Sequence, residues 1–237
     1  MLERSGFYID NDFIEFSKSA RNLGVLIDNG LTLSEHLDGV VRSATHHLRK
    51  IASIKKYLNV SSLKTLVHNL VISRLDYCNS LYYALPNTQL SRIQMILNRA
   101  ARLISGCSHI DRITPILIDL HWLPVRARIV YKICVLTYQT LNTGKPLYLY
   151  QLLRPFVLPT LIQVRHSLEF RLEEPRTRTH WGTRAFSSCA PRLYNSLPLD
   201  LRLSSNIAAF KSKLKTFIFS QCYDIETGTI VDLYRTN

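Results

Sequence analysis

The chain has 237 residues, of which 46% are hydrophobic and 20% are charged, with only 8 glycines and 9 prolines. This composition excludes an intrinsically disordered chain and is sufficient for a hydrophobic core in one or two domains. The formal net charge of +13 favours phosphate-bearing partners, although a soluble protein with a solvated basic surface has the same composition.

Residues 13–33 are predicted to be extended. Asn22–Asp28 forms a short β-branched run. Asn29-Gly30 follows it and is a dipeptide that supplies the positive φ angles of a tight turn. We therefore predict one strand with a turn, and a second strand before it is compatible with the sequence.

The apolar period changes to that of a helix at Ser34, which is a candidate cap. The spacing predicts a first helix up to about Leu58, a second from Ser61 or Ser62 to about Tyr83, and a third from Gln89. Gly106 is the natural stop of the third helix. The apolar positions of the first helix are Leu37, Val40, Val41, Ala44, Leu48, Ile51, Ile54 and Leu58.

Further helical segments are predicted over residues 115–120, from Pro124 to about Leu141, and over residues 147–153. Residues 154–203 contain prolines at 155, 159, 175, 191 and 198 and are expected to be irregular. This stretch is either an ordered basic loop that docks nucleic acid or an irregular linker. A last amphipathic helix begins near Asn206, with Ile207, Phe210, Leu214 and Phe217 facing inward.

These elements predict a mainly α fold, a helical bundle with a small N-terminal β element and an irregular Arg/Pro-rich segment before the last helix. The expected division is a β element (1–33), a helical region (34–106), a helical extension (107–153) and a basic irregular segment with the C-terminal helix (154–237).

Several classes of protein are disfavoured. Five scattered cysteines without a C-x-x-C pair argue against a disulfide framework and against a zinc site. The first ten residues lack an apolar signal segment, and the longest apolar runs are too short for a membrane span. We therefore expect a soluble, intracellular protein without a membrane partner, in either the nucleus or the cytoplasm.

Catalytic signatures are also missing from the sequence. A two-metal site needs clustered carboxylates, whereas the aspartates are dispersed singly and no two are adjacent. No histidine pair has the i, i+4 spacing of a metal clamp, and no phosphate-cradling glycine loop or nucleophile elbow is present. We predict no catalytic residues, no metal, no cofactor and no small-molecule substrate.

Basic residues recur on the outer side of nearly every predicted helix. One such stripe is usually a solvated face, but several of them together with the high net charge favour binding to nucleic-acid phosphates. The candidate nucleic-acid-binding residues are Arg42, Arg49, Lys50, Lys55, Lys56, Arg92, Arg99, Arg102, Arg176, Arg178 and Arg184.

Two aromatic segments have both a structural and a functional interpretation. Tyr77, Tyr82 and Tyr83 lie beside Arg74 and Asp76. They could form a surface for bases and phosphates, but half-buried tyrosines with a local Arg74–Asp76 pair are favoured, because the tyrosines lie on several helix faces. Similarly, Trp122 in His121-Trp122 is interpreted as a core anchor rather than a base platform.

Four segments in this order resemble the C-terminal end of the reverse transcriptase of non-LTR (LINE-type, jockey-like) retrotransposons. They are Leu23–Asp28 (LGVLID), Ser73–Pro86 (SRLDYCNSLYYALP), Leu120–Val125 (LHWLPV) and Ala190–Pro198 (APRLYNSLP). The resemblance covers roughly residues 22–219. The metal-binding Tyr/Phe-x-Asp-Asp tetrad of the polymerase does not occur in the sequence.

The resemblance implies that residues 23–28 correspond to the strand closing the palm. Residues 34–106 correspond to the thumb that grips the template–primer duplex, and the remainder to a C-terminal extension. It implies a catalytically incompetent fragment of an RNA-directed DNA polymerase that binds RNA, DNA or an RNA–DNA hybrid through phosphates. The alternatives are a helical protein–protein interaction module, a functionless product of a decayed element, and an enzyme that takes its carboxylates from a second chain.

Overall fold

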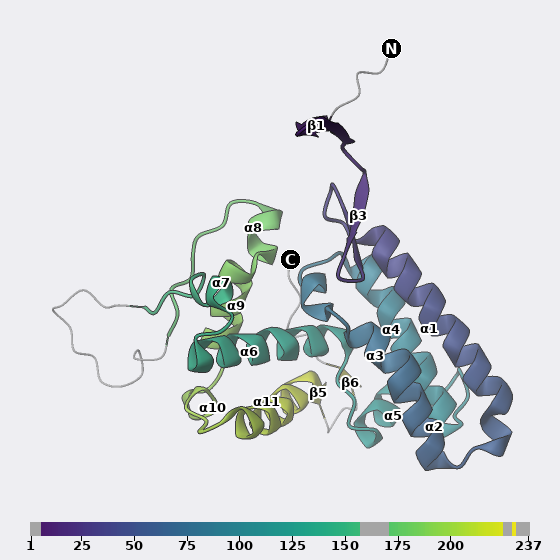
Figure 1. Ribbon diagram of the computed structural model, residues 1–237. Coiled ribbons are helices and arrows are strands. Elements are labelled where there is room, and N and C mark those ends of the chain that lie inside the picture. The colour runs from purple at the N-terminus through teal and green to yellow at the C-terminus, as the bar shows by residue number, and fades with distance from the viewer. Residues whose placement is uncertain (1–5, 157–170, 225–228, 231–237) are drawn as a thin grey trace.

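The computed structural model describes residues 6–156, 171–224 and 229–230. Their fold is mainly α-helical with a small N-terminal β part, which confirms the predicted class (Figure 1). The α-helices are α1 (Ser34–Ile54), α2 (Val60–Val67), α3 (Ser73–Asp76), α4 (Asn87–Ser105), α5 (Ile113–Asp119), α6 (Val125–Thr143), α7 (Leu147–Tyr150), α8 (His180–Arg184), α9 (Phe186–Asn195), α10 (Leu199–Arg202) and α11 (Ile207–Cys222). The strands are β1 (Gly6–Ile9), β2 (Asp12–Glu15), β3 (Ser19–Asn22), β4 (Val25–Asp28), β5 (Tyr223–Asp224) and β6 (Thr229–Ile230).

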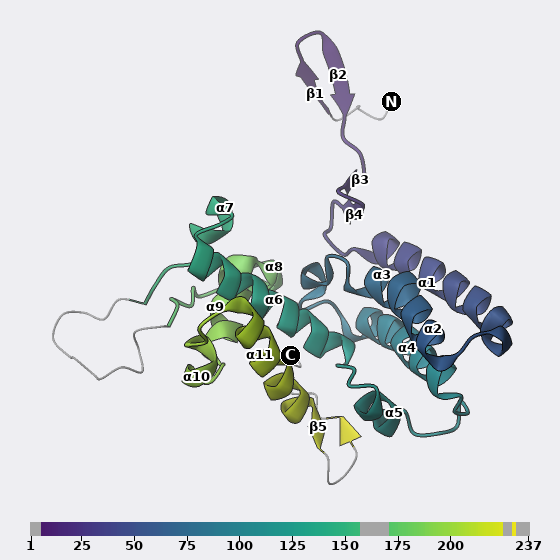
Figure 2. The same cartoon turned by 60° about the horizontal axis from the view of Figure 1, so that its bottom comes forward.

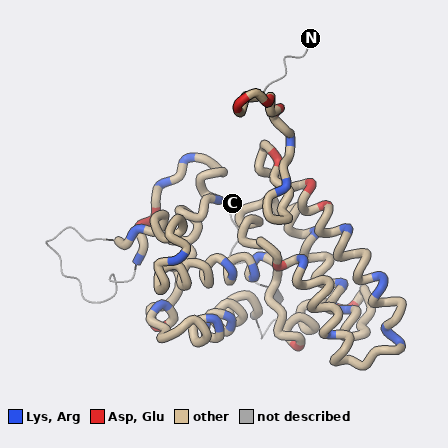
Figure 3. The backbone as a smooth tube through the Cα atoms, viewed as in Figure 1, with Lys and Arg blue, Asp and Glu red and all other residues tan. Residues whose placement is uncertain are grey.

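The strands form three separate antiparallel hairpins, β1–β2, β3–β4 and β5–β6. Figures 1 and 2 both show the β1–β2 hairpin projecting away from the helices. Its apolar side chains are exposed, Tyr8 to 73% and Phe16, just beyond β2, to 62%. The hairpin also carries acidic residues, which are the red segments at the top of Figure 3, whereas most of the charged positions on the helices are blue, the colour of Lys and Arg.

The predicted turn at Asn29-Gly30 is present, closed by the Leu31 N–H, which donates to the Asp28 carbonyl at 2.9 Å, but neither Asn29 nor Gly30 has the predicted positive φ. The tight turn of the β3–β4 hairpin lies at Leu23–Gly24. Leu23 has a φ of 46° and Gly24 a φ of 84°, and Asn22 pairs with Val25 across this turn. Two successive residues with positive φ form the two-residue turn that suits the twist of a hairpin. Asn29 also donates its N–H to the carbonyl of Lys18, at 3.0 Å.

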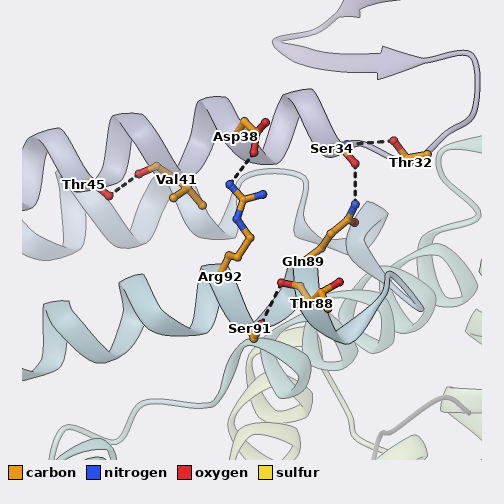
Figure 4. A network of polar contacts seen from close by, with 9 residues as sticks. All are labelled: Thr32, Ser34, Asp38, Val41, Thr45, Thr88, Gln89, Ser91 and Arg92. Atoms are coloured by element: carbon orange, nitrogen blue, oxygen red, sulfur yellow. Dashed lines mark hydrogen bonds and ion pairs between the residues drawn. The ribbon is translucent and has the colours of Figure 1, made fainter.

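Helices α1 and α4 pack against each other as the core of the first helix cluster. The predicted cap at Ser34 is wrong, because the Asp28 carboxylate accepts from the N–H groups of Thr32 and Leu33 at the start of α1. Figure 4 shows the polar contacts that join α1 to α4: Gln89 donates to the Ser34 hydroxyl at 2.7 Å, and Arg92 pairs with Asp38 at 2.6 Å.

The second predicted helix begins and ends differently from the prediction. Asn59 caps it by accepting from the Ser62 N–H, and a π-helical turn, His68–Ile72, joins α2 to α3. The helix ends at Asp76 rather than near Tyr83, because Tyr77 is extended and Cys78 is left-handed with a φ of 50°. Short 3-10 turns follow α1 and α3, at Lys55–Tyr57 and Asn79–Tyr82.

Helix α6 connects two clusters of helices, since it packs on α4 and the 79–82 turn as well as on α9 and α11 (Figures 1 and 2). Residues all around α6 are buried, including Thr137 and Thr140. In the second cluster the rings of Tyr138 and Phe210 stack with centroids 4.0 Å apart. The proposed domain division at residues 33, 106 and 153 stays a prediction.

The stretch predicted as irregular contains three helices, α8, α9 and α10, while residues 157–170 lie outside the described part of the chain. Pro191 lies inside α9 and Pro198 immediately precedes α10. Helix α9 forms despite its proline because Cys189, Ala190 and Leu193 are buried in its contact with α6, so that packing outweighs local propensity. The last helix, α11, is confirmed, and Asn206 caps it through the Ala209 N–H.

Candidate nucleic-acid interface

A groove of about 600 Å³ lies between the β3–β4 hairpin, α1 and α3. Three exposed arginines line it, each from a different element: Arg21 from β3, Arg42 from α1 and Arg74 from α3. Among the described lining residues only Glu35 is acidic. The groove therefore combines three cations from distant parts of the sequence.

Tyr77 and Gly24 form one end of the groove. The Tyr77 hydroxyl donates to the carbonyl of Leu23, which holds the half-exposed ring against the hairpin turn. A Cβ added to Gly24 would lie 3.7 Å from the ring, and the positive φ of Gly24 favours glycine. Gly39 also lines the groove, and a Cβ there would meet no atom within 4 Å, so the wall of α1 is open at this point.

His36 is a buried residue of the groove lining. Its Nδ1 accepts from the Leu26 N–H at 3.4 Å, and its Nε2 lies 3.1 Å from the Tyr82 hydroxyl. Burial, and secondarily the charge of Arg21, lower the pKa of His36 below its ordinary value of 6.5. A neutral imidazole with an acceptor at Nδ1 fits both contacts, so this histidine connects hairpin, α1 and the 79–82 turn without adding charge.

We expect the unfolding free energy to depend on pH through His36. Its folded pKa is depressed, so below about pH 6.5 the unfolded chain binds the proton more readily and stability falls as the pH falls. Urea unfolding at neutral pH and near pH 5.5 should therefore show a smaller pH effect in His36→Gln than in the unaltered protein. The exposed His109→Gln is the matched control, and an equal pH effect in all three proteins would contradict this role.

The predicted basic residues of α1 and of the 3-10 turn after it continue from the groove along one exposed stripe. Arg42 and Arg49 are seven residues apart, which places them on the same side of α1, and Lys56 follows seven residues later in the 3-10 turn; all three are exposed. Lys50 flanks this stripe and is exposed, whereas Lys55 is half-buried. Figure 3 shows the blue segments along α1.

The other predicted residues do not line the groove, and three of them have structural partners. Arg92 pairs with Asp38, Arg102 donates to the Asp111 carbonyl at 3.1 Å, and Arg184 donates to the Leu31 carbonyl at 2.9 Å. Arg184 also lies over the Trp181 ring. The remaining arginines, Arg99, Arg176 and Arg178, are exposed elsewhere on the surface.

Sequence reasoning missed Arg21 and Arg74 as groove residues. The predicted local pair between Arg74 and Asp76 is wrong, since Asp76 pairs with Arg128 of α6 at 2.8 Å. The Arg74 Nε donates to the carbonyl of Leu70 in its own helix. The aromatic and polar character of residues 73–86 was the only signal in the sequence that pointed to Arg74. The true partner of Asp76 could not be found from this segment, because it lies 52 residues further along the chain.

Several aspartates have structural partners. Besides Asp28, Asp38 and Asp76, Asp111 accepts from the Ser108 N–H at 2.7 Å. Across the described ranges, no three His, Cys, Asp or Glu side chains lie close enough to hold a metal ion. Likewise, no helix within those ranges has the length and apolarity to cross a membrane.

Comparisons with protein-family models and with solved structures give no match. A comparison with known proteins gives one similarity. The chain is 29% identical over 118 residues to a Drosophila melanogaster protein described as a probable RNA-directed DNA polymerase from transposon X-element. The aligned part is 48% of this chain but only 13% of the fly protein, so the chain spans a small part of that relative's length. This distant similarity supports an origin related to retrotransposon reverse transcriptases.

Proposed function

We propose that this chain is a C-terminal part of a non-LTR retrotransposon reverse transcriptase that binds RNA, DNA or an RNA–DNA hybrid through phosphates and does not polymerise nucleotides itself. The similarity to the fly polymerase and the four resembling segments support the parentage. The observation that carries the binding function is the convergence of Arg21, Arg42 and Arg74 on one groove.

The groove arginines are suited to phosphate binding because a guanidinium presents a planar fork of donors to phosphate oxygens. The ion pairs given above use Arg92 and Arg128, and none of the groove arginines pairs with a described acid. The exposed guanidinium groups are therefore accessible to an external anion.

The stripe on α1 extends this surface beyond the groove. Arg42 and Arg49 lie about 10 Å apart along α1, from a rise of 1.5 Å per residue, and Lys56 follows in the 3-10 turn after α1. Together with the groove, this stripe supplies about five cations over roughly 20 Å of helical chain, a length suited to a nucleic-acid backbone rather than to a single small anion.

The proposed lack of polymerase activity rests on the chemistry of a two-metal site. A two-metal polymerase needs neighbouring carboxylates, and no two aspartates are adjacent in the chain. Primer extension by the purified protein with Mg²⁺ and with Mn²⁺ should give no nucleotide incorporation. Any incorporation, including incorporation that requires a second chain, would overturn this part of the proposal.

Binding is tested by a salt titration of the purified protein with labelled single-stranded RNA, duplex DNA and an RNA–DNA hybrid. If about five phosphates are neutralised, the logarithm of the binding constant should fall against the logarithm of salt with a slope of roughly −3.5 to −4.5. A folded protein that binds none of them at low salt would contradict the proposal and favour a protein–protein module or a functionless product.

A further inference from the structure

A second hollow lies on the same helical segment as the groove. It has a volume of about 350 Å³ and is lined by Lys64 and Thr65 of α2, by His68 and Asn69 of the π-helical turn, and by Leu120 and Trp122 before α6. The four residues from α2 and the π-turn are exposed. Trp122 is half-buried and packs partly against the core, as the sequence predicted, while another part of it lines the hollow. The hollow thus brings one large aromatic ring next to a polar, cationic wall.

The backbone of Trp122 is held on both sides. Its backbone N–H donates to the Leu117 carbonyl at 2.9 Å, and its backbone carbonyl accepts from the Tyr223 hydroxyl. The Arg128 guanidinium lies 5.8 Å from the centre of the indole ring, within the range of a cation–π contact. Arg128 is itself fixed, because it donates to the Leu123 carbonyl and pairs with Asp76, both at 2.8 Å.

The local backbone adds a second indication. The π-helical turn His68–Ile72 interrupts an otherwise continuous helix from Val60 to Asp76. Such turns are rare and occur frequently at functional sites, because the extra residue changes the direction of side chains along the helix. Here the turn contributes His68 and Asn69 to the hollow.

We propose that this hollow binds one unpaired nucleotide, with its base stacked on Trp122 and its phosphate beside Lys64 and His68. An aromatic ring held in place next to a cation is the arrangement with which proteins bind the bases of single strands. Bases inside a duplex are stacked on each other and offer no free face to such a ring. The proposal rests on the phosphate binding proposed above and adds a preference for single-stranded nucleic acid.

The position of the hollow relative to the groove fits one continuous strand. Asn69 of the hollow and Ser73 of the groove are four residues apart, and the Ser73 hydroxyl donates to the Asn69 carbonyl. Both residues are exposed, so the two sites adjoin along one side of this helix.

Trp122 fluorescence tests this proposal in the folded, full-length chain. The sequence contains two tryptophans, so Trp181→Phe leaves Trp122 as the only indole. This variant is titrated with a single-stranded RNA, with a backbone of equal length that lacks bases, and with a blunt duplex. Anisotropy of a label on each ligand reports binding, while the tryptophan emission reports stacking.

We expect the single-stranded RNA to quench the emission and the abasic strand and the duplex to bind without quenching. The abasic strand should bind about 5- to 150-fold more weakly, as expected from losing one stacked base. Trp122→Leu should remove this difference, whereas Trp181→Phe retains it. Binding without quenching, or equal quenching by the abasic strand, overturns the stacking proposal but leaves phosphate binding intact. Failure of all three ligands to bind overturns both.

Discussion

Replacing Arg21, Arg42 and Arg74 together by glutamate should weaken binding of RNA or of an RNA–DNA hybrid by about 100-fold or more. The expected loss is roughly 1 to 1.5 kcal/mol for each charge-assisted contact, and three contacts together give a loss of 3 to 4.5 kcal/mol. Repulsion between the introduced carboxylates and the phosphates adds to this loss. All three side chains are exposed, so the variant should fold.

The matched control is the triple variant Lys211→Glu, Lys213→Glu and Lys215→Glu. These lysines are exposed on α11, in the helix cluster away from the groove (Figure 1), and their reversal changes the net charge by the same amount. Anisotropy titrations at one fixed, low salt concentration compare the two variants, with circular dichroism to check folding. Equal losses in both variants would indicate a diffuse charge effect and contradict the groove as the binding site.

The second large effect is expected on stability, from Phe210→Ala. Phe210 is fully buried, and its ring stacks on Tyr138 at a centroid distance of 4.0 Å and an interplanar angle of 10°. Truncation of a buried phenylalanine leaves a cavity and costs about 3 to 5 kcal/mol, a large share of the total stability of a typical domain. The melting temperature should fall by roughly 6 to 20 °C for a chain of this size.

Phe16→Ala makes the same chemical change at a side chain that is 62% exposed. Its expected effect on the unfolding free energy is within about 0.5 kcal/mol. Urea unfolding followed by circular dichroism measures both variants. A loss below about 1 kcal/mol in Phe210→Ala would mean that α6 and α11 are not packed through this ring pair.

Helices with a local signal at both ends could be predicted from the sequence. Helix α4 begins just after Pro86 and ends at Gly106, which adopts the left-handed conformation with a φ of 75°. Similarly, α11 begins next to Asn206, as predicted, and the Asn206 side chain caps it. In these cases the period of the apolar residues and the cap depend only on neighbours within a few positions, which is the information that a single sequence contains.

Elements that depend on distant partners could not be predicted in the same way. The helix of residues 60–76 ends at Asp76, whose carboxylate pairs with Arg128 of α6. Helix α9 contains Pro191, which indicates a break by local rules, but burial of the helix on α6 stabilises it. In α9 the long-range contact outweighs the local preference, and at Asp76 the partner of the carboxylate lies too far along the chain for local rules to find.

The sequence by itself determined the alternation of apolar and basic positions on α1 and the dispersal of the aspartates. It also carries the resemblance to a polymerase and lacks the catalytic tetrad of that polymerase. The candidate site was decided only by the tertiary structure. Arg21, Arg42 and Arg74 come from three elements, and they surround one groove because the Leu23–Gly24 turn, His36 and Tyr77 join the hairpin to α1 and α3. Residue spacing along the chain determines the face of a helix, whereas the meeting of separate faces is set by packing over long sequence distances.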